Sequence, residues 1–223
     1  MTVCWFAQFR RATAEMAWLS DAIAATPGLQ QGLIHTPSSA TDPYLDDGAP
    51  PELAMQLYFA DIAALEAALA PGGHLQRLQT LECDGATQQA MVVRRYPVPD
   101  PLFRTPADDQ PCTYLVAYEG PAEDRPAWLA HYIADHPPIM AQFPGVRQIE
   151  IYTCMDWCGG LAWPRVAHMQ RNKVVFDNRA ALSAALNSPV RHAMRASFHR
   201  FPLFTGPVTH FPMATTTVTP HAS

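Results

Sequence analysis

The sequence predicts an α+β protein in which two tandem ferredoxin-like βαββαβ repeats form a pseudo-dimeric α+β barrel. Three observations lead to this fold. The 223 residues leave room for two units of roughly 100 residues each. The chain matches itself once at a nearly constant offset, and both copies show the same order of expected strands and helices. Helices on one face of an antiparallel sheet leave its other face bare, and we expect the second copy to cover that face by packing against it.

The two copies align without a gap from residue 27 to residue 69 of the first copy, at an offset of 117 residues. The matched positions, first copy then second, are Pro27-Gly28 with Pro144-Gly145, Phe59 with Phe176, Asp61 with Asn178, and residues 63–69 with 180–186. Two further matches have slightly different offsets, as loop insertions would produce: residues 17–19 match 127–129, and residues 95–97 match 210–212.

The first copy begins with an expected strand over residues 2–10, which is rich in aromatic and β-branched side chains. A helix follows, because Met16, Leu19 and Ile23 keep a helical period and Pro27-Gly28 ends it. Residues 29–36 form the second strand. The connector over residues 36–51 is rich in Pro, Ser and Asp, which is typical of a loop.

Residues 53–59 form the third strand of this copy, because apolar side chains recur at every second position. Asp61 is an N-cap residue type placed just before a helix whose apolar stripe is Ile62, Leu65 and Leu69. The last strand covers residues 88–96. The second copy repeats the order, with strands over 113–119, 146–155, 166–176 and 208–213 and helices over 126–142, 179–185 and 188–198.

This pattern divides the chain into a first repeat (1–97), a proline-rich linker (98–111) and a second repeat (112–223), which we expect to be the active copy. We expect the barrel to close within one chain, and a homodimer of the intact chain is left open.

Composition and motifs exclude several classes of function. Net charge is −5 with no long basic run, so we expect no nucleic-acid partner. We find no apolar stretch of about 20 residues and no secretory signal, and we expect a cytoplasmic protein without a membrane partner. The five dispersed cysteines and scattered histidines match no standard metal spacing, and nucleotide-binding and serine-hydrolase motifs are missing. We therefore expect no cofactor and no metal.

The second copy carries a short series of motifs: Trp128 and Tyr132, then His136-Pro137-Pro138-Ile139, then Pro144-Gly145 before a strand. In this series the chain resembles the EthD-type branch of the dimeric α+β barrel superfamily. The resemblance implies a pocket between a sheet and its helices that holds a hydrophobic, often aromatic molecule, with His, Tyr or Asp groups handling protons. The first copy has no equivalent of His136, which implies one functional site per chain.

Four residues are candidates for catalysis. His136 precedes Pro137-Pro138, where we expect the helix to end, so its imidazole would stand at a rigid helix terminus. His168 is expected on the third strand of the second copy, on the same face as Gln170. Tyr152 is expected on the polar face of the preceding strand, and Asp156 follows it as a carboxylate that could partner an imidazole.

The candidates for substrate binding are polar or aromatic side chains on strands, on the first helix of the second copy, or in the connector 155–164: His35, Tyr58, Trp128, Tyr132, Glu150, Trp157, Trp163 and His210. The polar face that carries Glu150 either meets solvent or is covered by the other sheet, in which case its carboxylate needs partners. Two adjacent glycines between Trp157 and Trp163 would suit either a lid over a flat ligand or a tightly packed loop.

These patterns favour cofactor-independent acid/base chemistry on a small hydrophobic aromatic compound, by a lyase, dehydratase or cyclase. Two alternatives stay open: a cofactor-free oxygenase of aromatic substrates, and a binding protein that carries an aromatic ligand without changing it.

Overall fold

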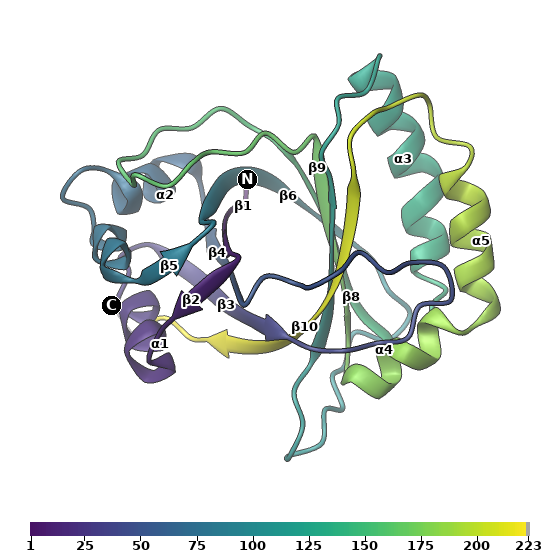
Figure 1. Ribbon diagram of the computed structural model, residues 1–223, viewed down its shortest axis with the longest axis horizontal. Coiled ribbons are helices and arrows are strands. Elements are labelled where there is room, and N and C mark those ends of the chain that lie inside the picture. The colour runs from purple at the N-terminus through teal and green to yellow at the C-terminus, as the bar shows by residue number, and fades with distance from the viewer. Residues whose placement is uncertain (222–223) are drawn as a thin grey trace.

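A computed structural model describes residues 1–221 and shows the βαββαβ order twice (Figure 1). The first repeat comprises β1 (Val3–Phe9), α1 (Met16–Ala24), β3 (Leu29–Pro37), β4 (Leu53–Phe59), α2 (Ile62–Leu69) and β6 (Thr87–Tyr96). The second comprises β7 (Cys112–Tyr118), α3 (Arg125–Met140), β8 (Val146–Cys154), β9 (Gln170–Phe176), α4 (Arg179–Leu186), α5 (Pro189–Phe198) and β10 (Val208–Val218). The first repeat also has a short ribbon of β2 (Arg11–Thr13) with β5 (Glu82–Asp84) and a 3₁₀ helix, η1 (His74–Thr80).

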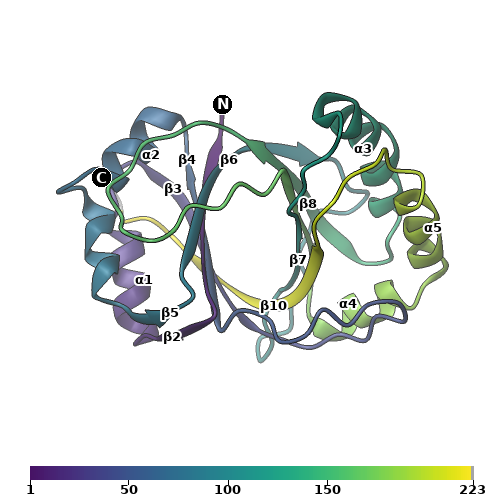
Figure 2. The same cartoon turned by 45° about the horizontal axis from the view of Figure 1, so that its top comes forward.

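The eight long strands form one closed barrel in the order β1-β4-β3-β10-β7-β9-β8-β6. The α+β barrel of two repeats is thus confirmed, but the sheets do not simply pack face to face. Their edges pair, β3 with β10 and β6 with β8, both antiparallel. Helices α1 and α2 cover one side of the barrel and α3, α4 and α5 cover the other (Figure 2).

Each strand sends alternate side chains outward to its helices and inward to the barrel interior. On β8 the outward Ile149 and Ile151 are buried in the core of the second repeat. The inward Glu150 and Tyr152 are also buried, so the polar face of this strand is covered rather than solvated. The outward faces supply two separate apolar cores, one under each set of helices.

Several local signals act as the sequence predicts. Asp61 and Asn178 are N-caps of α2 and α4, and each side chain accepts a hydrogen bond from the backbone N–H three residues later. Gly28 and Gly145 both have φ near +75°, a conformation that glycine adopts without the Cβ penalty, at the same helix-to-strand turn.

The structure corrects two expected boundaries. Helix α3 runs through Pro137-Pro138 to Met140, close to the expected range 126–142, so the separate expectation that it ends at these prolines is wrong. The Ala141 N–H resumes the helical bonds at the Pro137 carbonyl. His136 therefore lies inside a helix rather than at its terminus. Strand β9 begins at Gln170, so His168 lies in the connector before it.

The expected match of residues 95–97 with 210–212 is wrong. Val3 pairs with Phe59 and Val92, whereas Cys112 pairs with Phe176 and Ala214. Because Phe59 corresponds to Phe176, Val92 corresponds to Ala214, an offset of 122 (214 minus 92). The offset is 109 for the first strands (112 minus 3), 117 for the second and third, and 122 for the last, so it drifts before β3 and β8 and after α2 and α4. The β3–β4 connector, 38–52, and the β8–β9 connector, 155–169, are equally long and leave the offset unchanged.

These two connectors cross between the repeats, in opposite directions. The β3–β4 connector leaves the first repeat and runs beneath α4, where Asn187 Nδ2 donates to the Thr41 carbonyl at 2.9 Å (Figures 1 and 2). The β8–β9 connector leaves the second repeat and runs over α2, where the Gly160 N–H donates to the Leu69 carbonyl at 2.7 Å. A connector of each repeat thus packs against a helix of the other repeat.

Candidate active site

A cavity of about 460 Å³ lies between the sheet of the second repeat and its helices α3, α4 and α5. This volume suits a small organic molecule. Most of its lining is apolar or aromatic: Leu45, Val116, Tyr118, Met140, Phe143, Val174, Leu186, Met194, Phe198, Phe204 and Val208. Its polar lining groups are Tyr114, His136, Asn172, Arg191, Arg195 and His210. Leu45 belongs to the crossing connector of the first repeat, so both repeats build the site.

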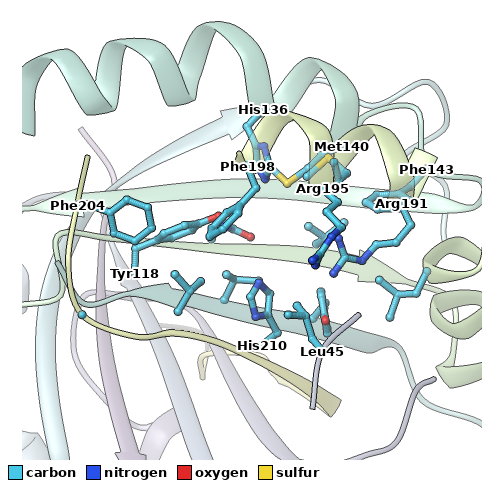
Figure 3. Close-up of a pocket in the computed structure, with 18 residues that line it drawn as sticks. Leu45, Tyr118, His136, Met140, Phe143, Arg191, Arg195, Phe198, Phe204 and His210 are labelled. Atoms are coloured by element: carbon cyan, nitrogen blue, oxygen red, sulfur yellow. The ribbon is translucent and has the colours of Figure 1, made fainter. Parts of the chain in front are cut away.

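Figure 3 shows how the lining is organised. Tyr118, Phe198 and Phe204 gather on one side, and the guanidinium groups of Arg191 and Arg195 lie together on the other. His136 on α3 and His210 on β10 face the cavity from opposite walls. A molecule bound in the cavity would therefore lie between the two imidazoles, with aromatic side chains at one end and the two guanidinium groups at the other.

The tautomer of His136 follows from a chain of hydrogen bonds behind it. Arg200 forms an ion pair with Asp135 at 2.7 Å, and Ser197 Oγ–H donates to the same carboxylate oxygen at 2.6 Å. Since that hydroxyl proton is used, Ser197 Oγ accepts from His136 Nδ1–H at 2.8 Å. Nε2 of His136 is then the unprotonated nitrogen, and it makes no hydrogen bond within residues 1–221. Burial lowers the pKa of His136 to about 3, so the ring is neutral near pH 7 and offers a lone pair.

His210 has a different partner. Its Nδ1 and its backbone N–H both bond to Asp47 Oδ2, each at 2.8 Å, and the hydrogen bond from His210 lowers the pKa of this carboxyl. Asp47 comes from the crossing connector. A carboxylate on Nδ1 holds an imidazole in one orientation and one tautomer, which leaves Nε2 to exchange a proton.

Arg191 and Arg195 lie one turn apart on α5. Arg191 is buried, and its Nε donates to Asp42 Oδ2 at 2.9 Å. Arg195 is exposed and forms no ion pair with any carboxylate of the described chain. Both guanidinium groups lie over the ring of Tyr44, 5.2 and 4.5 Å from its centroid.

The corresponding space in the first repeat is filled. Strand pairing places Trp5 and Phe9 at the positions of Tyr114 and Tyr118. Trp163, from the β8–β9 connector, stacks on Trp5 at 6.2 Å and meets Phe9 edge-on at 4.9 Å. The structure thus places Trp163 in the core of the first repeat and away from the cavity.

Four of the candidate residues meet inside the barrel rather than at the cavity. Tyr58 and Tyr152 each donate to Glu150 Oε2 at 2.7 Å, and Lys173 Nζ lies 3.2 Å from the same oxygen. Gln56 joins Tyr152 to His35, with distances of 2.8 and 3.0 Å. Burial raises the pKa of both tyrosines, and it lowers the pKa of His35 to about 3. The buried carboxylate and phenols therefore have partners, and the network joins both repeats.

The remaining candidates are dispersed. Trp128 and Tyr132 stack at 5.2 Å behind the cavity, where the Tyr132 ring lies 5.1 Å from that of His136. His168 lines a separate surface pocket near Glu119 and Arg125, and burial lowers its pKa to about 3. Asp156 is exposed and bonds to no imidazole of the described residues.

The connector around Trp157 is not a lid over this cavity. Gly159 and Gly160 lie against the end of α2, where a Cβ on Gly160 would come within 2.9 Å of Pro71. Trp157 packs on the core of the first repeat, with Arg165 over its ring at 3.9 Å. The adjacent glycines thus permit close packing of a loop.

Sequence reasoning missed Asp47, Arg191, Arg195 and Ser197. Spacing offered one signal, because Arg191 and Arg195 are i and i+4 on a helix. Asp47 offered none, since its contact with His210 spans 163 residues.

No three His, Cys, Asp or Glu side chains of residues 1–221 come together as a metal site would require. Within the same residues, the helices are all too short or too polar to cross a bilayer.

The chain matches no protein-family model, and no curated protein matches it. Solved structures do resemble it. An anthrone oxidase-like protein has a TM-score of 0.64 at 14% identity, over 97% of this chain and 92% of that chain. A protein from Lactobacillus acidophilus NCFM, provisionally assigned as a monooxygenase, has a TM-score of 0.60 at 12% identity, over 98% and 96%. A mutant chlorite dismutase from Candidatus Nitrospira defluvii has 0.50 at 10%, over 96% and 91%.

At these identities the likeness concerns the fold alone. The closed α+β barrel that the resemblance implies is thereby confirmed as a fold, with both repeats in one chain. Fold does not decide chemistry, which has to be argued from the cavity.

Proposed function

We propose that the protein is an enzyme that moves a proton on a small aromatic compound bound in the cavity of the second repeat. One observation carries the proposal: two imidazoles with different hydrogen-bond partners face each other across an otherwise largely apolar cavity. An apolar wall binds a ring, and an imidazole can both take and give a proton near neutral pH.

The two histidines have different roles in this proposal. His210, oriented by Asp47, is the proton carrier. His136 stays neutral, and its Nε2 accepts a hydrogen bond from a hydroxyl of the substrate, which positions that substrate. This division revises the expectation that His136 itself is the general acid/base, because a group with a pKa of about 3 holds no proton at pH 7.

The reaction we favour is a lyase, dehydratase or cyclase step that requires no cofactor. His210 Nε2 takes a proton from a carbon next to a carbonyl of the aromatic substrate, and the electron pair moves onto the carbonyl oxygen. The resulting enolate either expels hydroxide, which leaves as water with the proton returned by His210, or closes a ring onto a second carbonyl. The same anion could instead react with oxygen, and the likeness to an anthrone oxidase-like protein supports keeping that alternative.

The test is turnover of a panel of phenols and aromatic ketones under air and under nitrogen, followed by mass spectrometry. We expect product under both gases, with a loss of about 100-fold or more in His210→Gln and a smaller loss in Asp47→Asn. Product under air alone would establish the oxygenase, and saturable binding without product would establish a carrier. A Soret band after addition of haemin, abolished by His136→Ala, would overturn the cofactor-free proposal.

A further inference from the structure

The proposed proton transfer uses His136 and His210 and gives no role to the two arginines at the cationic end of the cavity. Arg191 and Arg195 are i and i+4 on α5, and like charges at this spacing destabilise a helix. Both side chains nevertheless point to one place at the cavity wall (Figure 3). Such a pair is expected where an anion comes between the two groups.

The acidic groups nearby are already engaged. Asp42 accepts from Arg191 Nε at 2.9 Å and from the Tyr114 hydroxyl at 3.0 Å. Asp47 is bonded to His210. Arg195 has no ion-pair partner within residues 1–221, and the two terminal nitrogens of the buried Arg191 donate to no group there. Several N–H donors therefore remain for a ligand.

Both guanidinium groups share one aromatic contact. Each lies over the face of Tyr44, and Tyr44 is itself hydrogen-bonded to His192 on α5. A guanidinium fork matches the two oxygens of a carboxylate. The aromatic wall of Phe198, Phe204 and Tyr118 lies on the opposite side of the cavity, which suits a ring with an acid group on its edge.

We infer that the ligand of this cavity is an aromatic carboxylate, whose acid group binds Arg191 and Arg195 while its ring lies against the aromatic wall. This inference rests on the proposed function for the ring and names the substrate class. The carboxylate anchors the molecule at one end, so the position next to it faces His136 and His210.

The test compares 1-hydroxy-2-naphthoate with the neutral 1-naphthol by isothermal titration calorimetry on the full chain. We expect the naphthoate to bind the wild type about tenfold more tightly or better, as a charge-assisted pair commonly provides. Arg195→Met should remove most of this preference by weakening the binding of the naphthoate much more than that of 1-naphthol, and Arg195→Lys should retain part of it. Arg77→Met, which removes an exposed charge on η1 of the first repeat, is the matched control and should keep the full preference.

The outcomes separate the two proposals. Equal affinities for the two compounds in the wild type, or a preference that survives Arg195→Met, would overturn the carboxylate site and leave the aromatic pocket intact. Failure of both compounds to bind would overturn the aromatic pocket, and the carboxylate site with it. Arg195 is the position to change because Arg191 also holds the buried Asp42, and its loss would disturb the fold.

Discussion

Replacing Glu150 by Gln should destabilise the barrel far more than replacing its partner Lys173 by Met. Both side chains are only 1% exposed, and they lie 3.2 Å apart inside the barrel. Removing one member of a buried ion pair commonly costs about 3–5 kcal/mol, because the other charge stays buried without compensation. The two members differ here in what remains to compensate each of them.

Glu150 keeps other partners when Lys173 is removed. Arg95 Nε lies 3.1 Å from Oε1, and Tyr58 and Tyr152 donate to Oε2. Burial alone would raise the pKa of Glu150, but Lys173 and these tyrosines outweigh it and the net shift is downward. Lys173 by contrast keeps Tyr58 Oη, at 2.8 Å, as its one side-chain hydrogen-bond partner within residues 1–221 once the Glu150 carboxylate is gone. We therefore expect a loss of about 3–5 kcal/mol for Glu150→Gln and of about 1–2 kcal/mol for Lys173→Met.

The assay is urea unfolding of the two single variants and the double variant, followed by circular dichroism. The double variant should lose less than the sum of the single losses by about 1 kcal/mol or more, because the two groups interact directly. Arg10→Met, which breaks an exposed ion pair with Asp84, is the control and should cost less than about 1 kcal/mol. A Glu150→Gln protein within about 1 kcal/mol of the wild type, or a larger loss in Lys173→Met, would refute the reasoning.

Two further predictions concern stability. His35, His136 and His168 have pKa values of about 3 in the folded protein, against 6.5 for a free imidazole, so the folded state favours their neutral forms. The contribution of these rings to the free energy of unfolding is fully present above pH 6.5. It is lost as the pH drops toward 3, by up to about 1.4 kcal/mol per pH unit for each ring, because the unfolded chain then binds protons that the folded chain does not. The urea concentration at the unfolding midpoint should therefore be lower at pH 5 than at pH 7.5, and equal midpoints would contradict this prediction. Separately expressed halves, residues 1–99 and 112–223, should associate or aggregate in light scattering, since β3, β6, β8 and β10 each lose an edge partner; two well-behaved monomers would show that the barrel does not depend on both repeats.

The sequence indicates the fold well because the signals for its elements are local. An N-cap such as Asp61 acts within three residues, and a Pro-Gly turn such as 27–28 within two. The alternation along residues 53–59 likewise coincides with β4. Repetition of these signals at one offset then implies two copies of one unit.

The site was much less accessible to sequence reasoning, because it depends on contacts that no local pattern encodes. His136 and His210 were both candidates, and both line the cavity. Asp47, by contrast, belongs to a loop whose composition says only that it is a loop. Nothing in it predicts that the loop crosses to the other repeat. Glu150 and Tyr152 illustrate the same difficulty, because their alternation indicates a polar face without showing whether solvent or a second sheet covers it.

The crossing connectors also explain why the space equivalent to this cavity is filled in the first repeat. The position of His210 on β10 corresponds to Gln88 on β6, since Val116 pairs with His210 and Ala7 pairs with Gln88 at equivalent places in the two sheets. Gln88 accepts from Trp5 Nε1 at 3.3 Å and donates to the carbonyls of Leu161 and Trp163 at 3.2 and 2.7 Å. One strand position therefore holds the proposed proton carrier, His210, in the second repeat. In the first repeat the same position, Gln88, anchors the loop that fills the equivalent space. Glutamine in place of histidine at this position of the first repeat thus goes together with the presence of Trp163 in the equivalent space.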